Sequence, residues 1–167
     1  MLIITLMRDD FFYILNEDKY AANMRISELE KEIQELGPEF HDVFNQSSET
    51  WHDNAPFDAL RDRQSVLFAE LQSLKMVLSK AAISIPKAKK NRIGIGDTVT
   101  VEDAVSGKIS TYFIAGDWTA RTGRSIDNVI IISSRSPLAK ALVGKTKGDS
   151  ALFRNKLIIK NIEFGSL

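Results

Sequence analysis

The first half of the chain carries two runs of apolar side chains that recur every three or four residues, on either side of a polar segment at residues 47–54. A spacing of about 3.5 residues keeps a narrow apolar stripe on one side of a helix and is typical of coiled coils. The polar segment, SSETWHDN, is so short that the second helix has to double back. The pattern therefore predicts an antiparallel helical hairpin with these seam positions: Ala22, Ile26, Leu29, Ile33, Leu36, Phe40, Val43, then Phe57, Leu60, Gln64, Leu67, Leu71, Leu74, Leu78, Ala81 and Ile85.

Both predicted helices have ends that can be read from the sequence. The first is expected to begin between residues 9 and 18 and to run to about Gln46, with a kink or local break at Gly37-Pro38. The second is expected to begin near Asp53–Pro56 and to end by Ile85, because a proline follows. With about 30 residues in each arm and about 1.5 Å per residue, the hairpin would be about 45 Å long.

From Ile93 onwards the apolar period changes to two, which indicates β-strands separated by Gly, Asp and Asn. One short helix is expected at Pro137–Val143, opened by Ser136 and closed by Gly144. The predicted fold class is α+β, a coiled-coil hairpin followed by a small, mostly antiparallel sheet wrapped over one helix. The expected strands are residues 98–101, 109–115, 129–133, 151–153 and 157–163.

The change of pattern coincides with a change of charge. Residues 1–85 carry 15 acidic and 8 basic side chains, a net −7, and residues 86–167 carry 7 acidic and 14 basic ones, a net +7. We expect a hairpin domain at 1–86, a basic linker at 87–92 and a second domain at 93–167. The basic stretch is either a solvated hinge or a contact for phosphates.

Composition and motifs exclude several kinds of site. The chain has no cysteine, which excludes disulfides and thiolate chemistry and makes a reducing cytoplasm the natural compartment. The two histidines, His41 and His52, lack a zinc-binding spacing, and no complete P-loop or dinucleotide-binding loop occurs. The first seven residues, MLIITLM, are too short to cross a bilayer, so we expect an edge strand or a packed arm there. The sequence does not resemble that of an enzyme that works alone.

The polar tip of the hairpin offers carboxylates at Glu49 and Asp53, with Asp58 close behind. Hard cations such as Mg²⁺ bind carboxylate oxygens but need ligands from several sources. Glu49 and Asp53 would complete a Mg²⁺ site that another protein begins, where a second metal activates water for phosphodiester cleavage. Asp53 or Asn54 has a second interpretation, as the cap of the following helix, and Asp58 suits the first turn of that helix.

Two motifs resemble those of the bacterial GreA/GreB transcript-cleavage factors. Asp53-Asn54-Ala55, followed by Phe57, Ala59 and Arg61, resembles the family's tip motif at the start of the second coiled-coil helix. The segment SPLAKALVGK at 136–145, with Gly148-Asp149, resembles the family's S-P-L-G-x-A-L-L-G-K-x-x-G-D signature. The order of a hairpin and a small β domain is also the family's, so the resemblance covers nearly the whole chain.

The resemblance implies an FKBP-like C-terminal domain that docks at the rim of the secondary channel of RNA polymerase while the hairpin enters the channel. It implies that Asp53 and Glu49 help the polymerase to hold a second Mg²⁺ and to cleave its own backtracked RNA. The isolated protein would bind no metal, would meet the RNA 3′ end only inside the elongation complex, and would be a cytoplasmic monomer without a membrane partner. The implied docking residues are Ser136, Pro137, Leu138, Lys140 and Lys145.

The tip departs from the family pattern G-D-L-K-E-N. Asp53 matches the acid before the asparagine, whereas Thr50 stands at the first acid's place and Glu49 is one residue further away; Trp51 and His52 fill the centre. Either Glu49 substitutes for that acid, or the protein resembles the family's inhibitory members, which occupy the channel without stimulating cleavage. Two interpretations of other classes stay open, a prolyl isomerase with a coiled-coil arm and a coiled-coil scaffold that does not contact polymerase.

Overall fold

A computed structural model describes residues 12–46, 55–82 and 91–165 of the chain. The chain divides into two compact units, Tyr20–Ser79 and Met1–Lys19 together with Lys80–Leu167. The expected N-terminal arm at 1–7 and most of the expected linker at 87–92 lie outside the described residues. The domain boundaries drawn from the sequence therefore stay a prediction.

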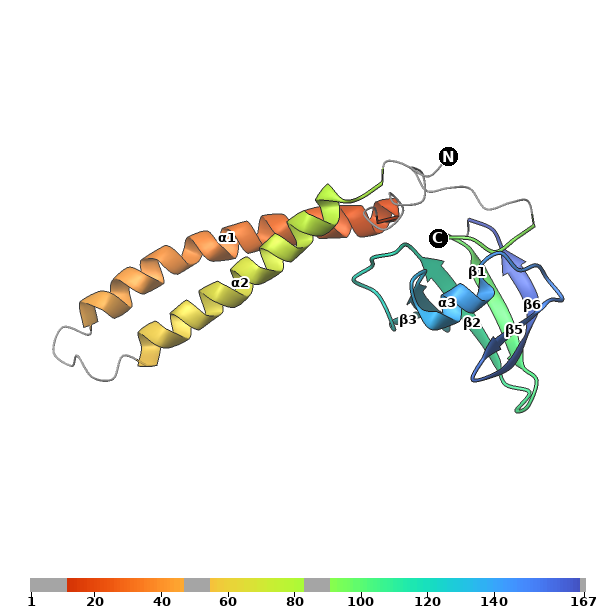
Figure 1. The fold of residues 1–167 in the computed structure, drawn as a ribbon. Coiled ribbons are helices and arrows are strands. Elements are labelled where there is room, and N and C mark those ends of the chain that lie inside the picture. Colours follow the sequence, from red (N-terminus) through yellow and green to blue (C-terminus); the bar gives the residue numbers. More distant parts are fainter. Residues whose placement is uncertain (1–11, 47–54, 83–90, 166–167) are drawn as a thin grey trace, which may run out of the picture. The chain divides into compact units, whose positions relative to one another are not determined.

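Two helices, α1 (Asn16–Gln46) and α2 (Ala55–Ser79), supply the hairpin unit (Figure 1). Their antiparallel course follows from ion pairs that join Arg25 to Glu70 and Glu39 to Arg63. None of the predicted seam positions within α1 and α2 is exposed, which confirms the predicted register in both helices, whereas Ala81 lies beyond the end of α2, in a β-bridge with Phe12. The most deeply buried of these positions are Ala22, Leu29, Leu36, Leu67, Leu71 and Leu74.

The helix α1 continues through Pro38 without a break. The backbone of Pro38 can donate no hydrogen bond, so the helix loses one bond at that turn. Gly37 and Pro38 are both exposed, while the neighbouring Leu36 is fully buried in the seam. The expected local break is therefore absent, and the buried Leu36 and half-buried Phe40 keep the two halves of α1 in one register.

A six-stranded sheet forms the second unit, in the order β3-β4-β2-β1-β6-β5 (Figure 1). All neighbouring strands are antiparallel except β2 and β4, which are parallel. The five expected strands and the short helix are confirmed, and β3 is an addition of only two residues. The elements are β1 (Thr98–Asp103), β2 (Ile109–Ala115), β3 (Ser125–Ile126), β4 (Val129–Ser133), α3 (Pro137–Leu142), β5 (Ser150–Phe153) and β6 (Asn155–Glu163).

The sheet buries apolar side chains on both faces. On one face Val99, Val101 and Ile159 share a core cluster with Leu138 and Leu142 of α3. On the other face a smaller cluster contains Phe113, Ala115 and Ile131, with Leu15 packed against it. Successive residues of a strand point to opposite faces, so the neighbours Phe113 and Ile114 belong to different clusters. Within the described ranges, no helix is long and apolar enough to span a bilayer.

The segment before α1 packs closely on the sheet unit. The backbone N–H of Tyr13 donates to Oδ2 of Asp117 at 2.9 Å, and the N–H of Asp117 donates to the carbonyl of Tyr13. A Cβ on Gly116 would lie 2.2 Å from that carbonyl oxygen, so only glycine fits without a shift of the backbone. In the first turn of α1, Asp18 is 1% exposed and accepts hydrogen bonds from Thr119 at 2.8 Å and Arg121 at 3.0 Å.

The burial of the seam residues predicts how far a large-to-small substitution lowers the stability of the hairpin. Leu71→Ala should lower the free energy of unfolding by about 2–5 kcal/mol, because Leu71 is 5% exposed. Val66→Ala is the matched control on the same helix; Val66 is 66% exposed, and the change should stay within about 0.5 kcal/mol. Thermal denaturation followed by far-ultraviolet circular dichroism measures both. Equal losses from the two variants would contradict the register.

Candidate functional site

The tip of the hairpin, with Glu49, Thr50, Trp51, His52, Asp53 and Asn54, lies outside the described residues. The structure describes the arms that carry it. Phe40 of α1 and Phe57 of α2 meet edge to face with ring centroids 5.5 Å apart, and Arg63 donates to Glu39 at 3.3 Å. The arms are therefore held together by an aromatic contact and an ion pair shortly before the chain enters the tip.

Asp58 is the one predicted tip carboxylate that the structure describes. It lies in the first turn of α2, as expected, and forms an ion pair with Arg61 at 3.3 Å. Both side chains are exposed, so this pair contributes little to stability. In the described part of the chain, no three histidine or acidic side chains are grouped so that they could hold a metal ion.

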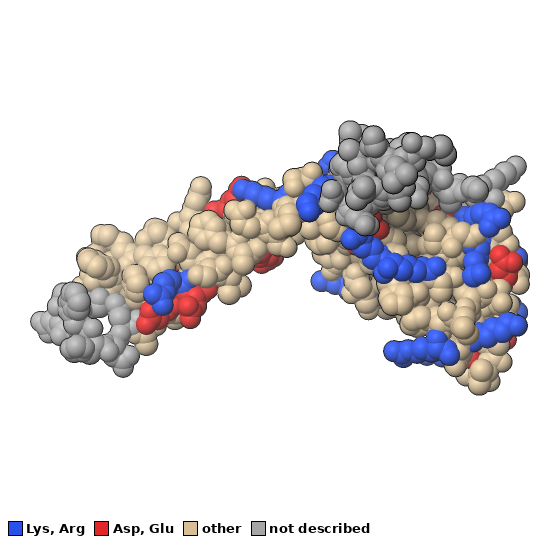
Figure 2. Space-filling view, in the orientation of Figure 1, with Lys and Arg blue, Asp and Glu red and all other residues tan. Residues whose placement is uncertain are grey.

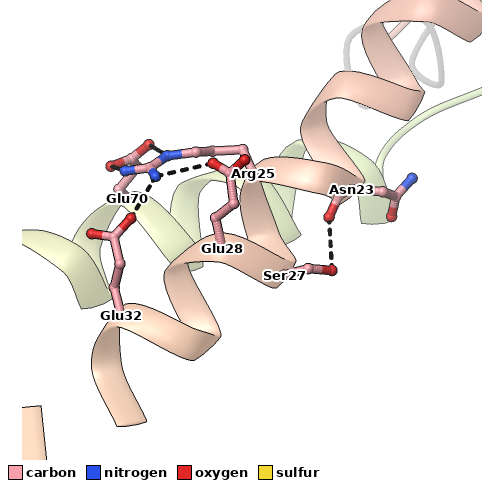
Figure 3. Close-up of polar contacts among 6 residues, drawn as sticks. All are labelled: Asn23, Arg25, Ser27, Glu28, Glu32 and Glu70. Atoms are coloured by element: carbon pink, nitrogen blue, oxygen red, sulfur yellow. Dashed lines mark hydrogen bonds and ion pairs between the residues drawn. The ribbon is translucent and has the colours of Figure 1, made fainter. Parts of the chain in front are cut away.

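An arginine-centred network links the two arms away from the tip (Figure 3). Arg25 of α1 donates to both carboxylate oxygens of Glu70 on α2, at 2.8 and 3.1 Å, and also to Glu32 and Glu28 of its own helix. Its guanidinium lowers the pKa of Glu70, and the carboxylates raise the pKa of Arg25. Two parallel hydrogen bonds from the planar guanidinium of Arg25 to the carboxylate of Glu70 fix both the distance and the relative orientation of the two groups. This pair therefore helps to set the relative register of the arms.

The signature segment at 136–145 contains several residues that shape the fold. Ser136 caps α3, because its side chain accepts a hydrogen bond from the backbone N–H of Ala139 at 3.2 Å, and Pro137 begins the helix. Leu138 and Leu142 are buried in the core cluster. Among the predicted docking residues, Pro137 and Lys140 are exposed, Ser136 and Lys145 are half-buried, and Leu138 is only 8% exposed.

The second part of the signature builds the loop that follows α3. Gly144 and Gly148 adopt φ angles of 82° and 90°, which other L-residues rarely adopt. Asp149 closes the loop by accepting hydrogen bonds from the backbone N–H of Thr146 at 2.8 Å and from its hydroxyl at 3.0 Å. These bonds lower the pKa of Asp149. The signature therefore identifies a fold element, and only part of its surface is available to a partner.

Two groups of polar residues were not foreseen from the sequence. The charges around Arg25 lie beside the heptad seam, where charged residues of coiled coils pair across helices, and this spacing was the available signal. The contacts of Asp18 with Thr119 and Arg121 join residues more than 100 positions apart, so no local sequence pattern could predict them.

A family model and individual known proteins that are similar to this chain carry names of the same family. The model of the family "Transcription elongation factor, GreA/GreB, C-term" matches residues 88–162. The Transcription elongation factor GreA of Paracoccus denitrificans is 39% identical over 98 residues, which cover 59% of this chain and 60% of that protein. The protein of the same name from Mesomycoplasma hyopneumoniae strain 7448 is 29% identical over 144 residues, which cover 81% of this chain and 86% of that protein.

Among solved structures, the GreA factor homolog 1 (Gfh1) protein of Thermus thermophilus is 20% identical, with a TM-score of 0.42. The match covers 92% of this chain and 99% of that one.

The closing bonds of Asp149 predict a pH dependence. Its pKa is lower in the folded state than in the unfolded chain, so its contribution to stability is present above the unfolded pKa and is lost as pH falls through the folded pKa. Asp149→Asn should lower the melting temperature at neutral pH and reduce the further fall on acidification. Asp127→Asn, at an exposed turn position, should leave the acid profile unchanged. Parallel profiles of Asp149→Asn and wild type would contradict this role.

Proposed function

The chain belongs to the GreA/GreB family of transcription elongation factors, and we propose that it binds RNA polymerase through the secondary channel and stimulates cleavage of backtracked RNA. The protein is a transcription factor and not itself an enzyme, so the polymerase would perform the cleavage. The observation that carries the proposal is the acid Asp53, directly before Asn54-Ala55, in the segment that joins the two arms of the hairpin. The site of action would be the cytoplasm, where the polymerase works.

The tip carboxylates have a defined role in this proposal. Asp53 and Glu49 would be delivered to the polymerase active site, where they would hold a second Mg²⁺ together with ligands of the polymerase and RNA. The arms support the proposal, because the tip segment links the C-terminal end of α1, at Gln46, to the N-terminal end of α2, at Ala55. Carboxylate oxygens suit Mg²⁺, and a cation shared by two proteins needs few ligands from either one.

Docking through α3 is the second part of the proposal. Ser136, Leu138 and Lys145 have roles in the cap, the core and the loop, whereas Pro137 and Lys140 present exposed side chains. We therefore assign the contact with the polymerase rim to the exposed side of α3, with Lys140 as its cation.

A second function, inhibition without cleavage, has one observation in its favour. Thr50 stands where the family has its first tip acid, and Glu49 is displaced by one residue. A protein of this kind would occupy the channel and compete with active factors. A cleavage assay on a stalled, backtracked complex with the cognate polymerase separates the two functions, because only the first one shortens the RNA.

The role of Asp53 predicts a loss of cleavage without a loss of binding. Asp53→Asn keeps the size of the side chain and its ability to cap a helix, since Asn caps about as well as Asp, and removes only the charge. Stimulated cleavage should therefore disappear while the affinity for polymerase stays within about two-fold, since the wild-type charge acts on the metal. Cleavage rates and binding isotherms of the same preparations measure this.

Two further tip variants serve as controls for the shifted acid. If Glu49 replaces the family's first acid, Glu49→Gln should be partly defective and Thr50→Asp should raise the cleavage rate. Full activity of Asp53→Asn would show that this residue is a helix cap only. Wild-type protein that competes for the channel but never stimulates cleavage at any Mg²⁺ concentration would establish the inhibitory function.

Docking through α3 predicts that a reversed charge at Lys140 weakens binding. Lys140→Glu should raise the Kd for polymerase by about ten-fold at low salt with an unchanged melting temperature, because Lys140 is exposed and contributes nothing to the core. Lys147→Glu, at an exposed loop position outside α3, is the matched control. Equal affinities for wild type and Lys140→Glu would place the docking face elsewhere.

A further inference from the structure

Arg154 occupies a backbone conformation that its residue type disfavours. It forms the turn between β5 and β6 with a φ of 57°, in the left-handed region where a Cβ approaches the carbonyl oxygen. Every other described residue with positive φ is a glycine, an asparagine or an aspartate, the types that tolerate this region. Because a glycine or asparagine would suit this turn better, the presence of arginine points to a use for its side chain.

The turn that contains Arg154 is tied to the turn between β1 and β2. Asp103 accepts hydrogen bonds from the backbone N–H groups of Val105 and Ser106 and, at 2.7 Å, from the side chain of Asn155. The backbone N–H of Ala104 donates to the carbonyl of Lys156 at 2.9 Å. The two turns therefore form one end of the sheet and present their side chains together.

We call this end the turn surface and define it by Val105, Lys108, Leu152, Arg154 and Lys156. All five side chains are exposed, and Leu152 lies directly opposite Lys156 in the β5–β6 ladder. Residues opposite each other in antiparallel strands share a face and lie about 5 Å apart at their Cβ atoms. The aliphatic side chain of Leu152 and the basic side chain of Lys156 are therefore neighbours on one face of the sheet.

The cations of the turn surface have no acidic partner among the described residues. Lys108 and Lys156 form no ion pair there, and Arg154 lies over the ring of Phe153, with its guanidinium carbon 5.7 Å from the ring centre. The carboxylate of Asp103 is already bound to the turns, and those hydrogen bonds hold its pKa at about 2. In Figure 2, Lys and Arg side chains are spread over the visible face of this unit, and some of them lie at the end where Figure 1 places the turn after β1.

The apolar members of the surface indicate a protein partner. Val105 is 78% exposed and Leu152 is 80% exposed, and aliphatic side chains of this kind are buried at the centre of protein interfaces. Binding of single-stranded nucleic acid relies on exposed aromatic rings, whereas the ring of Phe153 is partly buried beneath Arg154. Duplex interfaces are also more polar than this surface.

We propose that the turn surface is a second contact with RNA polymerase, apart from α3, and that it fits an acidic protein surface with an apolar centre. This inference rests on the proposed function. Arg154 and Lys156 would pair with carboxylates of the polymerase, while Leu152 and Val105 would pack between them. The contact with the ring of Phe153 would restrict the Arg154 side chain before binding, which reduces the side-chain entropy lost on binding.

The test uses the full chain and the cognate polymerase, with affinities measured at several salt concentrations. Arg154→Gly relieves the left-handed strain, so its melting temperature should equal or exceed that of wild type, while its Kd should rise about ten-fold at low salt. Arg154→Gly combined with Lys156→Gln should weaken binding further. Both differences should shrink as salt screens the charges. Arg124→Gln, an exposed arginine near β3, is the matched control and should bind like wild type.

The outcomes separate this inference from the proposed function. Wild-type protein that fails to bind polymerase overturns both, whereas wild-type binding with unchanged affinity of the double variant overturns the turn surface alone. A variant that loses affinity for duplex DNA or an RNA oligonucleotide, and not for polymerase, shows a nucleic-acid contact and also overturns it. If Arg154→Gly is itself unstable, Lys156→Gln alone decides, because that side chain is exposed and its change keeps the turn.

Discussion

Aspartate side chains that accept hydrogen bonds from backbone N–H groups hold the loops of the sheet unit in place. Asp97 binds the N–H groups of Gly94 and Gly165, and Asp117 binds that of Tyr13. Asp103 and Asp149 do the same in their own turns. Such charge-assisted bonds are stronger than neutral ones, and they place loops that carry few apolar side chains.

The same hydrogen bonds affect which basic side chains of this unit remain unpaired on its surface. A carboxylate that serves several N–H groups of its own loop is less able to pair with a distant lysine or arginine. Basic side chains such as Lys108, Lys140 and Lys156 are therefore left on the surface without an ion pair among the described residues. The net positive charge of the second half of the chain follows from composition, but its outward orientation follows from the use of the aspartates in the loops. Both proposed contacts with polymerase depend on that orientation.

The sequence predicted what local periodicity determines. The heptad seam was correct because burial in a two-helix hairpin depends only on which residues share one stripe, and Leu29, Leu36 and Leu71 lie where the spacing put them. The strands and α3 were predicted for the same reason. The close approach of Tyr13 to Gly116 and the burial of Asp18 were beyond prediction, because both depend on contacts across the sequence. A glycine next to a strand looks the same in the sequence whether or not another backbone passes over it.

The signature motif shows how far a match to a family transfers function. Ser136, Leu142 and Gly144 recur in such a motif because the cap, the core and the left-handed turn require them, and these requirements hold whatever the domain binds. Function has to be sought at positions whose residue the fold does not require, such as Lys140, or whose residue type disfavours its backbone conformation, such as Arg154.

The residues of the tip are likewise not explained by the pairing of charges along the arms. The arms pair acids with bases, as in Glu30 with Lys75, whereas residues 47–54 contain two acids and no lysine or arginine. Carboxylates without a cation nearby in the sequence are suited to binding a cation supplied from outside, which is the role we propose for Asp53.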